Sequence, residues 1–209
     1  MKKKDATELY RRLQAQNPAP KSELDFVNPY TLLVAVVLSA QATDKGVNKA
    51  TAPLFRKVKT PQAMLKLGLE GLKEHVKTIG LYNAKAANIL SLSQLLIERH
   101  EGQVPRDRDA LQALPGVGRK TANVVLNVAF GEPTMAVDTH VFRLANRTGL
   151  ASGKTPEEVE VGLLKATPPE FMDHAHHWLI LHGRYICKAR NPRCGDCIIR
   201  DLCGWGEKT

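Results

Sequence analysis

The sequence has no long hydrophobic run. A helix needs about 20 apolar residues to cross a bilayer, and the longest apolar stretch here, Leu32 to Leu38, is much shorter. We therefore expect no membrane-spanning helix. The first segment, MKKKDATELYRRLQAQ, also lacks the apolar stretch of a secretory signal peptide, because charged and polar residues follow its basic start. We therefore expect a cytoplasmic protein with no role in a membrane.

Runs of alternating β-branched residues, which indicate strands, are scarce as well. The best strand candidate, residues 134–137, is too short to anchor a sheet. Helical periodicity is present along most of the chain, and Ala86, Ile89 and Ser93 fall on one side of a predicted helix. Proline and glycine signals divide the chain into about ten segments of this kind, without a long linker. The sequence therefore predicts an all-α protein of two closely packed lobes.

The chain carries an excess of positive charge. Thirty Lys and Arg residues stand against 21 Asp and Glu, which gives a net charge of +9, and the basic residues are distributed along the whole sequence. A polyanion such as nucleic acid is a plausible partner, although composition alone leaves this open.

A glycine-rich turn occupies the middle of the sequence, in LPGVGRKTA at residues 114–122. Gly116 and Gly118 permit a compact turn, and the helix expected to start near Arg119 offers backbone N–H groups to an anion. An ordinary connection between helices would also use Gly and Pro. The segment is nevertheless similar to the helix-hairpin-helix element of nucleic-acid-binding proteins, and this resemblance implies contact with a DNA backbone. A weak internal echo, KTIGLYNAKAANIL at residues 77–90, has a similar pattern of a glycine turn followed by a basic residue, Ala and Asn.

Lys120 follows this turn directly, and its role is open on the residues alone. It is either a phosphate-binding charge or a nucleophile. A lysine amine attacks carbon only when it is neutral, and its ordinary pKa of about 10.4 leaves little neutral amine at pH 7. Burial, or the positive end of the helix that carries it, would lower this pKa.

Asp138 immediately precedes another helical pattern, in AVDTHVFRLANR. It is a natural N-cap, which is worth roughly 1 kcal/mol. Capping does not exclude chemistry, because a carboxylate held by backbone donors is also preorganised. Paired with Lys120 across a groove, it could accept a proton and stabilise a developing sugar cation. Asp44, by contrast, is expected only to cap a helix that starts at Lys45.

All four cysteines, Cys187, Cys194, Cys197 and Cys203, lie near the end of the sequence with the spacing C-x6-C-x2-C-x5-C. Four thiols so close together in a reducing compartment predict one metal or cluster site in preference to disulfides. The spacing does not distinguish a four-thiolate zinc site from a [4Fe–4S] cluster, and on the residues alone we favour zinc.

Several segments together resemble the endonuclease III family of base-excision DNA glycosylases with abasic-site lyase activity. They are LLVAVVLSAQATD, TIGLYNAKA, the stretch from LPGVGRKTANVV through AVDTHVFRLANRTGL, HHWLILHGRYIC and the cysteine segment, and they span essentially the whole chain. The resemblance implies that Lys120 is the Schiff-base lysine, that Asp138 is the essential aspartate and that the cysteines bind a [4Fe–4S] cluster. It also implies that Gln41 and Leu81 fill the gap left by an extruded nucleotide.

Basic residues between the first two cysteines, Lys188, Arg190 and Arg193, are expected to contact the phosphate backbone together with Gly116, Gly118 and Arg119. Family members can carry a further basic residue in this loop, where this chain has Asn191 between the arginines.

The implied fold is a helix-hairpin-helix DNA glycosylase fold of two lobes. Residues 22–132 would form a six-helix barrel with the hairpin, and residues 1–21 with 133–209 would form the cluster lobe. The implied function is removal of oxidised pyrimidines from duplex DNA and cleavage 3′ to the abasic site by β-elimination, by a monomer. Two alternatives remain: a non-catalytic helix-hairpin-helix DNA-binding protein and an adenine-mismatch glycosylase, a relative that typically lacks the lysine.

Overall fold

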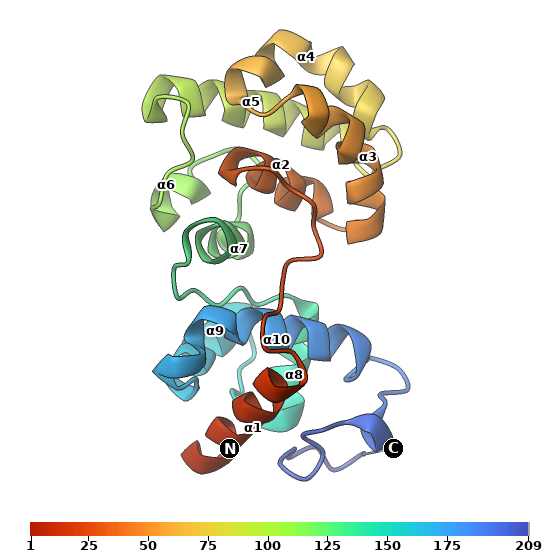
Figure 1. Ribbon diagram of the computed structural model, residues 1–209, viewed down its shortest axis with the longest axis vertical. Coiled ribbons are helices and arrows are strands. Elements are labelled where there is room, and N and C mark those ends of the chain that lie inside the picture. Colours follow the sequence, from red (N-terminus) through yellow and green to blue (C-terminus); the bar gives the residue numbers. More distant parts are fainter. Residues whose placement is uncertain (209) are drawn as a thin grey trace. The chain divides into compact units, whose positions relative to one another are not determined.

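The computed structural model describes residues 1–208, and this part of the chain is helical without any strand, which confirms the all-α prediction (Figure 1). The ten α-helices in this range are α1 Lys3–Gln16, α2 Pro29–Ser39, α3 Asp44–Lys57, α4 Pro61–Val76, α5 Tyr82–His100, α6 Arg108–Gln112, α7 Arg119–Phe130, α8 Thr139–Thr148, α9 Pro156–Ala166 and α10 Met172–Tyr185. Two short 3-10 helices, η1 Pro169–Phe171 and η2 Cys194–Asp196, complete the set. None of these helices has the length and apolar character needed to cross a membrane.

The chain divides into two compact units. Ser22–Gly131 forms one unit, which we call the hairpin unit, and it contains α2 to α7. Met1–Lys21 and Glu132–Thr209 together form the other, which we call the cysteine unit, and it contains α1 and α8 to α10.

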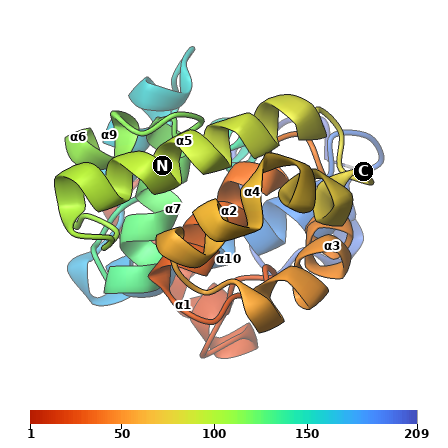
Figure 2. The same ribbon diagram turned by 90° about the horizontal axis from the view of Figure 1, so that it is seen from above.

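Helix α2 is the central helix of the hairpin unit. Every residue from Tyr30 to Leu38 is buried, so the helix is apolar on all sides and not on one face only. It packs against α3, α5 and α7, and Figure 2 shows it with α7 on one side and α3 on the other. The longest apolar run in the sequence is therefore the core of a globular unit.

Prolines mark where helices begin in both units. The side chains of Asn28, Thr60 and Thr155 each accept a hydrogen bond from the backbone N–H three residues later, and a proline follows each as the first helical residue. Proline is favoured there because the first N–H groups of a helix have no intrahelical acceptor. The Asn-Pro and Thr-Pro pairs that divide the sequence are thus helix starts with their caps.

The expected cap of α3 was wrong by one residue. The helix begins at Asp44 itself, and the Thr43 hydroxyl accepts the capping hydrogen bond from the backbone N–H of Gly46 at 3.1 Å. Thr43 has the extended backbone conformation that an N-cap requires, whereas Asp44 is already helical. A threonine and an aspartate in succession are both good caps, so the sequence alone did not decide between them.

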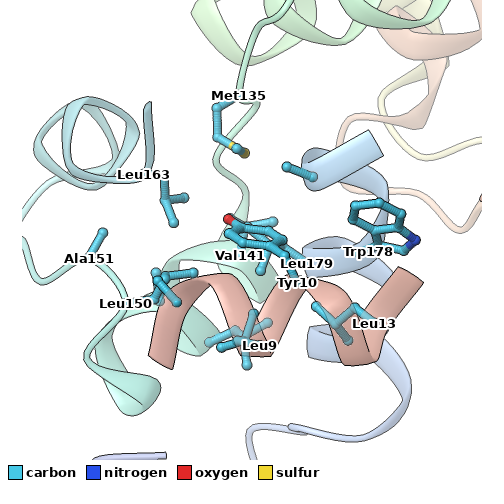
Figure 3. Close-up of a cluster of buried hydrophobic side chains, with 14 of the residues drawn as sticks. Leu9, Tyr10, Leu13, Met135, Val141, Leu150, Ala151, Leu163, Trp178 and Leu179 are labelled. Atoms are coloured by element: carbon cyan, nitrogen blue, oxygen red, sulfur yellow. The ribbon is translucent and has the colours of Figure 1, made fainter. Parts of the chain in front are cut away.

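The core of the cysteine unit joins residues from both ends of the chain. Figure 3 shows Leu9, Tyr10 and Leu13 of α1 against side chains from α8, α9 and α10. The ring of Tyr10 stacks on that of Phe171 with centroids 5.7 Å apart, and its hydroxyl shares a 2.8 Å hydrogen bond with the Thr167 hydroxyl. Burial of this apolar face explains why the N-terminal helix belongs to the same unit as the cysteines.

Candidate active site and cysteine site

The predicted hairpin is the connection between α6 and α7. Leu114 and Val117 are buried and anchor the turn, and the Val117 N–H donates to the Leu114 carbonyl at 3.1 Å. Gly116 has φ +79, a conformation that favours glycine, and a Cβ there would lie in tight contact, 3.1 Å from the Asn88 side chain.

Gly118 has a different reason to be glycine. It is the N-cap of α7 with an ordinary φ of −90, it makes no side-chain cap, and a Cβ there would meet nothing within 4 Å. Neither strain nor internal packing therefore excludes a side chain at Gly118. The turn instead presents uncovered backbone at the start of a helix, which is the geometry that suits a phosphate.

Lys120 is the second residue of α7, two residues after the exposed backbone of Gly118. Arg119 and Lys120 are both half-buried, while the residues from Ala122 to Asn127 are buried. The lysine is thus carried by a rigid, well-packed helix, and its side chain begins where that helix meets solvent. This placement allows either of the two roles considered for it.

Gln41 and Leu81, the expected gap-filling residues, share an unusual backbone conformation. Both have left-handed backbone conformations, with φ of 55 for Gln41 and 59 for Leu81, a region that few residues other than glycine adopt. Gln41 is exposed just after the end of α2, and Leu81, the residue before α5, has 65% of its surface exposed. An exposed leucine at the tip of a strained turn contributes little to a core, so a binding role fits it better.

Asp138 caps α8, as expected. Its Oδ1 accepts hydrogen bonds from the backbone N–H groups of His140 and Val141, each at 2.9 Å. Both of these capping bonds go to the same oxygen, and the carboxylate is half-buried. Oδ1 therefore fixes the carboxylate at the start of α8. Asp138 belongs to the cysteine unit and Lys120 to the hairpin unit.

Two arginines of α8 tie the cysteine segment to the helix that Asp138 starts. Arg143 donates to the carbonyls of Cys187 at 2.9 Å and Gly183 at 2.6 Å. Arg147 donates to the carbonyls of Lys188 at 2.7 Å and Ala189 at 3.1 Å, so it fixes the start of the loop between the first two cysteines.

These arginines also explain how the segment stays folded over α8. Arg147 lies 3.7 Å from the Cys187 sulfur and stacks over the Trp205 ring at 4.1 Å. Sequence reasoning missed both residues. The sequence shows only that Arg143 and Arg147 are four apart and so share one face of the helix, and it does not indicate their partners.

All four cysteines carry free thiols and line one pocket. His182, buried on α10, places Nε2 3.3 Å from the Cys197 sulfur. Among residues 1–208, no three His, Cys, Asp or Glu side chains are grouped to hold a single metal ion. Tetrahedral zinc needs four sulfurs at about 2.3 Å from one ion, whereas each thiolate of a [4Fe–4S] cluster binds a different iron. Four cysteines around one pocket can supply the four thiolates of such a cluster.

The basic residues of this segment differ in how available they are. Lys188 and Arg190 are exposed, but the Arg193 guanidinium pairs with the Asp196 carboxylate at 2.7 Å. Asn191 has φ 49, a conformation in which asparagine is favoured over longer side chains. The departure from a basic residue at this position therefore agrees with the backbone.

Comparison with known proteins places these features in one family. Residues 34–169 match the HhH-GPD superfamily of base excision DNA repair proteins, and residues 187–203 match the iron-sulfur binding domain of endonuclease III. Endonuclease III of Escherichia coli strain K12 is 62% identical over 209 residues, which cover 100% of this chain and 99% of that protein. Endonuclease III of Haemophilus influenzae is 62% identical with the same coverage. The chain belongs to the endonuclease III family.

Solved structures agree with this family assignment. A trapped endonuclease III–DNA covalent intermediate has a TM-score of 0.92 and 46% identity, and covers 100% of this chain and 98% of that one. A thermostable thymine-DNA glycosylase has a TM-score of 0.84 and 26% identity, and the match covers 99% of this chain and 98% of that one. The helix-hairpin-helix glycosylase fold predicted from the sequence is confirmed.

The cofactor prediction is confirmed as well. The matched iron-sulfur domain begins at Cys187 and ends at Cys203, so it contains all four cysteines. This member of the endonuclease III family therefore carries the iron–sulfur site, and the preference for zinc that spacing alone would allow is set aside.

Proposed function

We propose that this protein excises oxidised pyrimidines from duplex DNA and then cleaves the strand 3′ to the abasic site through a Schiff base on Lys120. The observation that carries the proposal is a half-buried lysine in the first turn of α7, directly after the hairpin, in a chain of the endonuclease III family. The solved relative captured as a covalent intermediate with DNA supports a nucleophilic residue in this fold.

In the proposed reaction, the Lys120 nitrogen forms a bond to C1′ of the extruded nucleotide. The bond from C1′ to the base breaks, and the base leaves with the electron pair and takes a proton. Opening of the sugar ring gives the Schiff base, whose positive nitrogen acidifies the C2′ hydrogens. Loss of one C2′ proton expels the 3′ phosphate oxygen with its electron pair, and water then releases the lysine.

Asp138 is proposed to supply the negative charge and the proton acceptor. Oδ1 is occupied by two backbone N–H groups, which leaves Oδ2 to take a proton from the lysine or to stabilise the cationic sugar. A carboxylate held in this way loses little freedom when it reacts, which favours catalysis.

DNA phosphates would be bound by backbone N–H groups of the protein and by basic side chains. The uncovered turn at Gly116 and Gly118 would bind one phosphate at the start of α7, with Arg119 beside it. Lys188 and Arg190 would contact another stretch of backbone, whereas Arg193 would contribute less because Asp196 already neutralises it. Gln41 and Leu81 would fill the space of the extruded nucleotide. We propose that the protein acts as a monomer in the cytoplasm.

The iron–sulfur cluster is proposed to be structural. Cys187, Cys194, Cys197 and Cys203 would each bind one iron. A bound cluster would cross-link the segment after α10 and hold its basic residues in place.

Borohydride trapping tests the lysine. The protein is incubated with a duplex containing an abasic site, and the covalent complex is reduced and counted. We expect Lys120→Ala to abolish trapping while its affinity for the same duplex stays largely unchanged. Lys66→Ala, which removes an exposed charge on α4, is the matched control and should trap like the wild type.

Substrate choice separates this proposal from its alternatives. We expect cleavage of duplexes with thymine glycol or an abasic site, and none of a duplex with an adenine mismatch. Binding without trapping or cleavage would indicate a non-catalytic DNA-binding protein, and excision of adenine alone would indicate a mismatch glycosylase. Equal trapping by Lys120→Ala and the wild type would show that another nucleophile acts.

A further inference from the structure

A second lysine of the hairpin unit is buried, and the proposed reaction does not use it. Lys85 lies in the first turns of α5 with 6% of its surface exposed. Its Nζ donates to the carbonyls of Leu38 at 3.0 Å and Ala40 at 2.6 Å. No carboxylate of the described residues pairs with it, and burial lowers the pKa of its ammonium. A buried lysine whose partners are two carbonyls is unusual and calls for a reason.

The two acceptors lie at the end of α2, just before Gln41. The last carbonyls of a helix have no intrahelical donor and form the negative end of its dipole, so a cation there is stabilising. Ala40 leaves the helix with ψ 117, and Gln41 follows with φ 55. The Lys85 ammonium therefore fixes the carbonyl that immediately precedes the strained residue.

Lys85 also contacts the second strained turn, through its backbone. Its N–H donates to the carbonyl of Leu81 at 3.1 Å. The same residue thus bonds to Ala40 with its side chain and to Leu81 with its main chain. Gln41 and Leu81, which are both exposed and both have positive φ, are tied to each other through one lysine.

The next turn of α5 reaches the hairpin. Asn88 lies three residues after Lys85, and its side chain packs against Gly116, where a Cβ would come within 3.1 Å. The internal echo in the sequence explains part of this pattern, because K-x-A-N occurs as Lys85 to Asn88 and as Lys120 to Asn123. Lys120 in one copy of the repeat is half-buried, whereas Lys85 in the other copy is buried and donates hydrogen bonds to backbone carbonyls.

We propose that Lys85 is a positioning residue that holds Gln41 and Leu81 in fixed register, so that both enter the duplex together when the damaged nucleotide leaves it. The proposal rests on the proposed function, in which these two side chains fill the gap. A shared anchor matters because each side chain must reach a defined place in the stack, and an error of about 1 Å can cost up to about 100-fold in rate.

Two substrates test the proposal with Lys85→Met, which keeps an unbranched side chain one atom shorter and removes its charge and donors. One is a duplex in which thymine glycol is base-paired, and the other has the same lesion opposite non-complementary bases, where it is already unstacked. We expect single-turnover excision from the paired duplex to slow by about 10- to 100-fold, and excision from the unpaired lesion to keep the wild-type rate.

A double-mutant comparison checks that the effect passes through the two side chains. The variant with Gln41→Ala and Leu81→Ala should show the same substrate dependence, and adding Lys85→Met to it should slow the reaction no further. Lys66→Met, which removes an exposed charge on α4, is the control and should behave as the wild type on both substrates. Should Lys85→Met fail to fold, Lys85→Gln, a shorter neutral donor, is measured with the same pair.

The outcomes are distinct. Full activity of the Lys85 variant on both substrates, an equal loss on both, or a loss that adds to that of the Gln41 and Leu81 variant would overturn the positioning role. A wild-type protein that excises thymine glycol from neither substrate would instead overturn the proposed function.

Discussion

Two substitutions of Asp138 separate its capping role from its proposed chemistry. Asn keeps a side-chain oxygen where Oδ1 now accepts from the N–H groups of His140 and Val141, each at 2.9 Å, so α8 should remain capped. Ala leaves both donors without their acceptor, which we expect to cost about 1 to 2 kcal/mol. For a protein of this size, that loss lowers Tm by about 2 to 8 °C.

Activity should follow a different order. Asn is neutral and a poor proton acceptor, so Asp138→Asn and Asp138→Ala should both lose most glycosylase activity. The assays are thermal unfolding followed by circular dichroism and single-turnover excision of thymine glycol. Near-normal turnover of Asp138→Asn would show that capping is the whole role of the residue. A fall in Tm for Asp138→Asn as large as that for Asp138→Ala would refute the capping argument.

Three further predictions concern the hairpin, stability at low pH and the cysteine segment. Gly116→Ala should lower the free energy of unfolding by about 1 to 2 kcal/mol, because φ +79 strains any residue with a Cβ. Gly118→Ala should unfold like the wild type. Equal effects of the two substitutions in urea titrations would contradict this distinction. Burial lowers the pKa of His177 to about 4, so the contribution of this residue to the free energy of unfolding is complete above the unfolded pKa of about 6.5 and is lost as pH falls toward 4. Between pH 7.5 and 5, the free energy of unfolding should therefore fall by about 2 kcal/mol more in the wild type than in His177→Asn. Identical pH profiles of the two proteins would exclude this cause. Arg147→Met should speed the loss of visible cluster absorbance in the presence of an iron chelator, because the carbonyls of Lys188 and Ala189 lose their donor. The control is Lys165→Met, which removes an exposed charge on α9. Equal bleaching of the two variants would count against a role for Arg147.

Local sequence signals predicted much of the fold. Proline and glycine placed the helix boundaries, since Asn28, Thr60 and Thr155 with their following prolines are helix starts. The apolar run from Leu32 to Leu38 is too short to span a membrane, and the structure buries it in α2. These signals succeed because capping and proline geometry act within a few residues of the chain.

Roles that depend on distant partners were not predictable in the same way. Nothing near Arg147 in the sequence indicates that its guanidinium lies against the carbonyls of Lys188 and Ala189. The burial of Lys85 was equally hidden, because a lysine is almost always a surface residue and its two carbonyl partners lie on another helix. Each of these contacts joins segments more than forty residues apart.

The sequence by itself determined the helices, the glycine turn and the set of four thiols, because each depends on residue type and short spacing. The tertiary structure decided which of two similar lysines is fully buried: Lys120 stays half-buried where α7 begins, and Lys85 is held inside the hairpin unit by the carbonyls at the end of α2. It also decided why the two glycines differ, since Gly116 faces Asn88 and Gly118 faces open space. The physical reason is that a group becomes buried, and a carbonyl without a donor becomes costly, only when distant helices pack together.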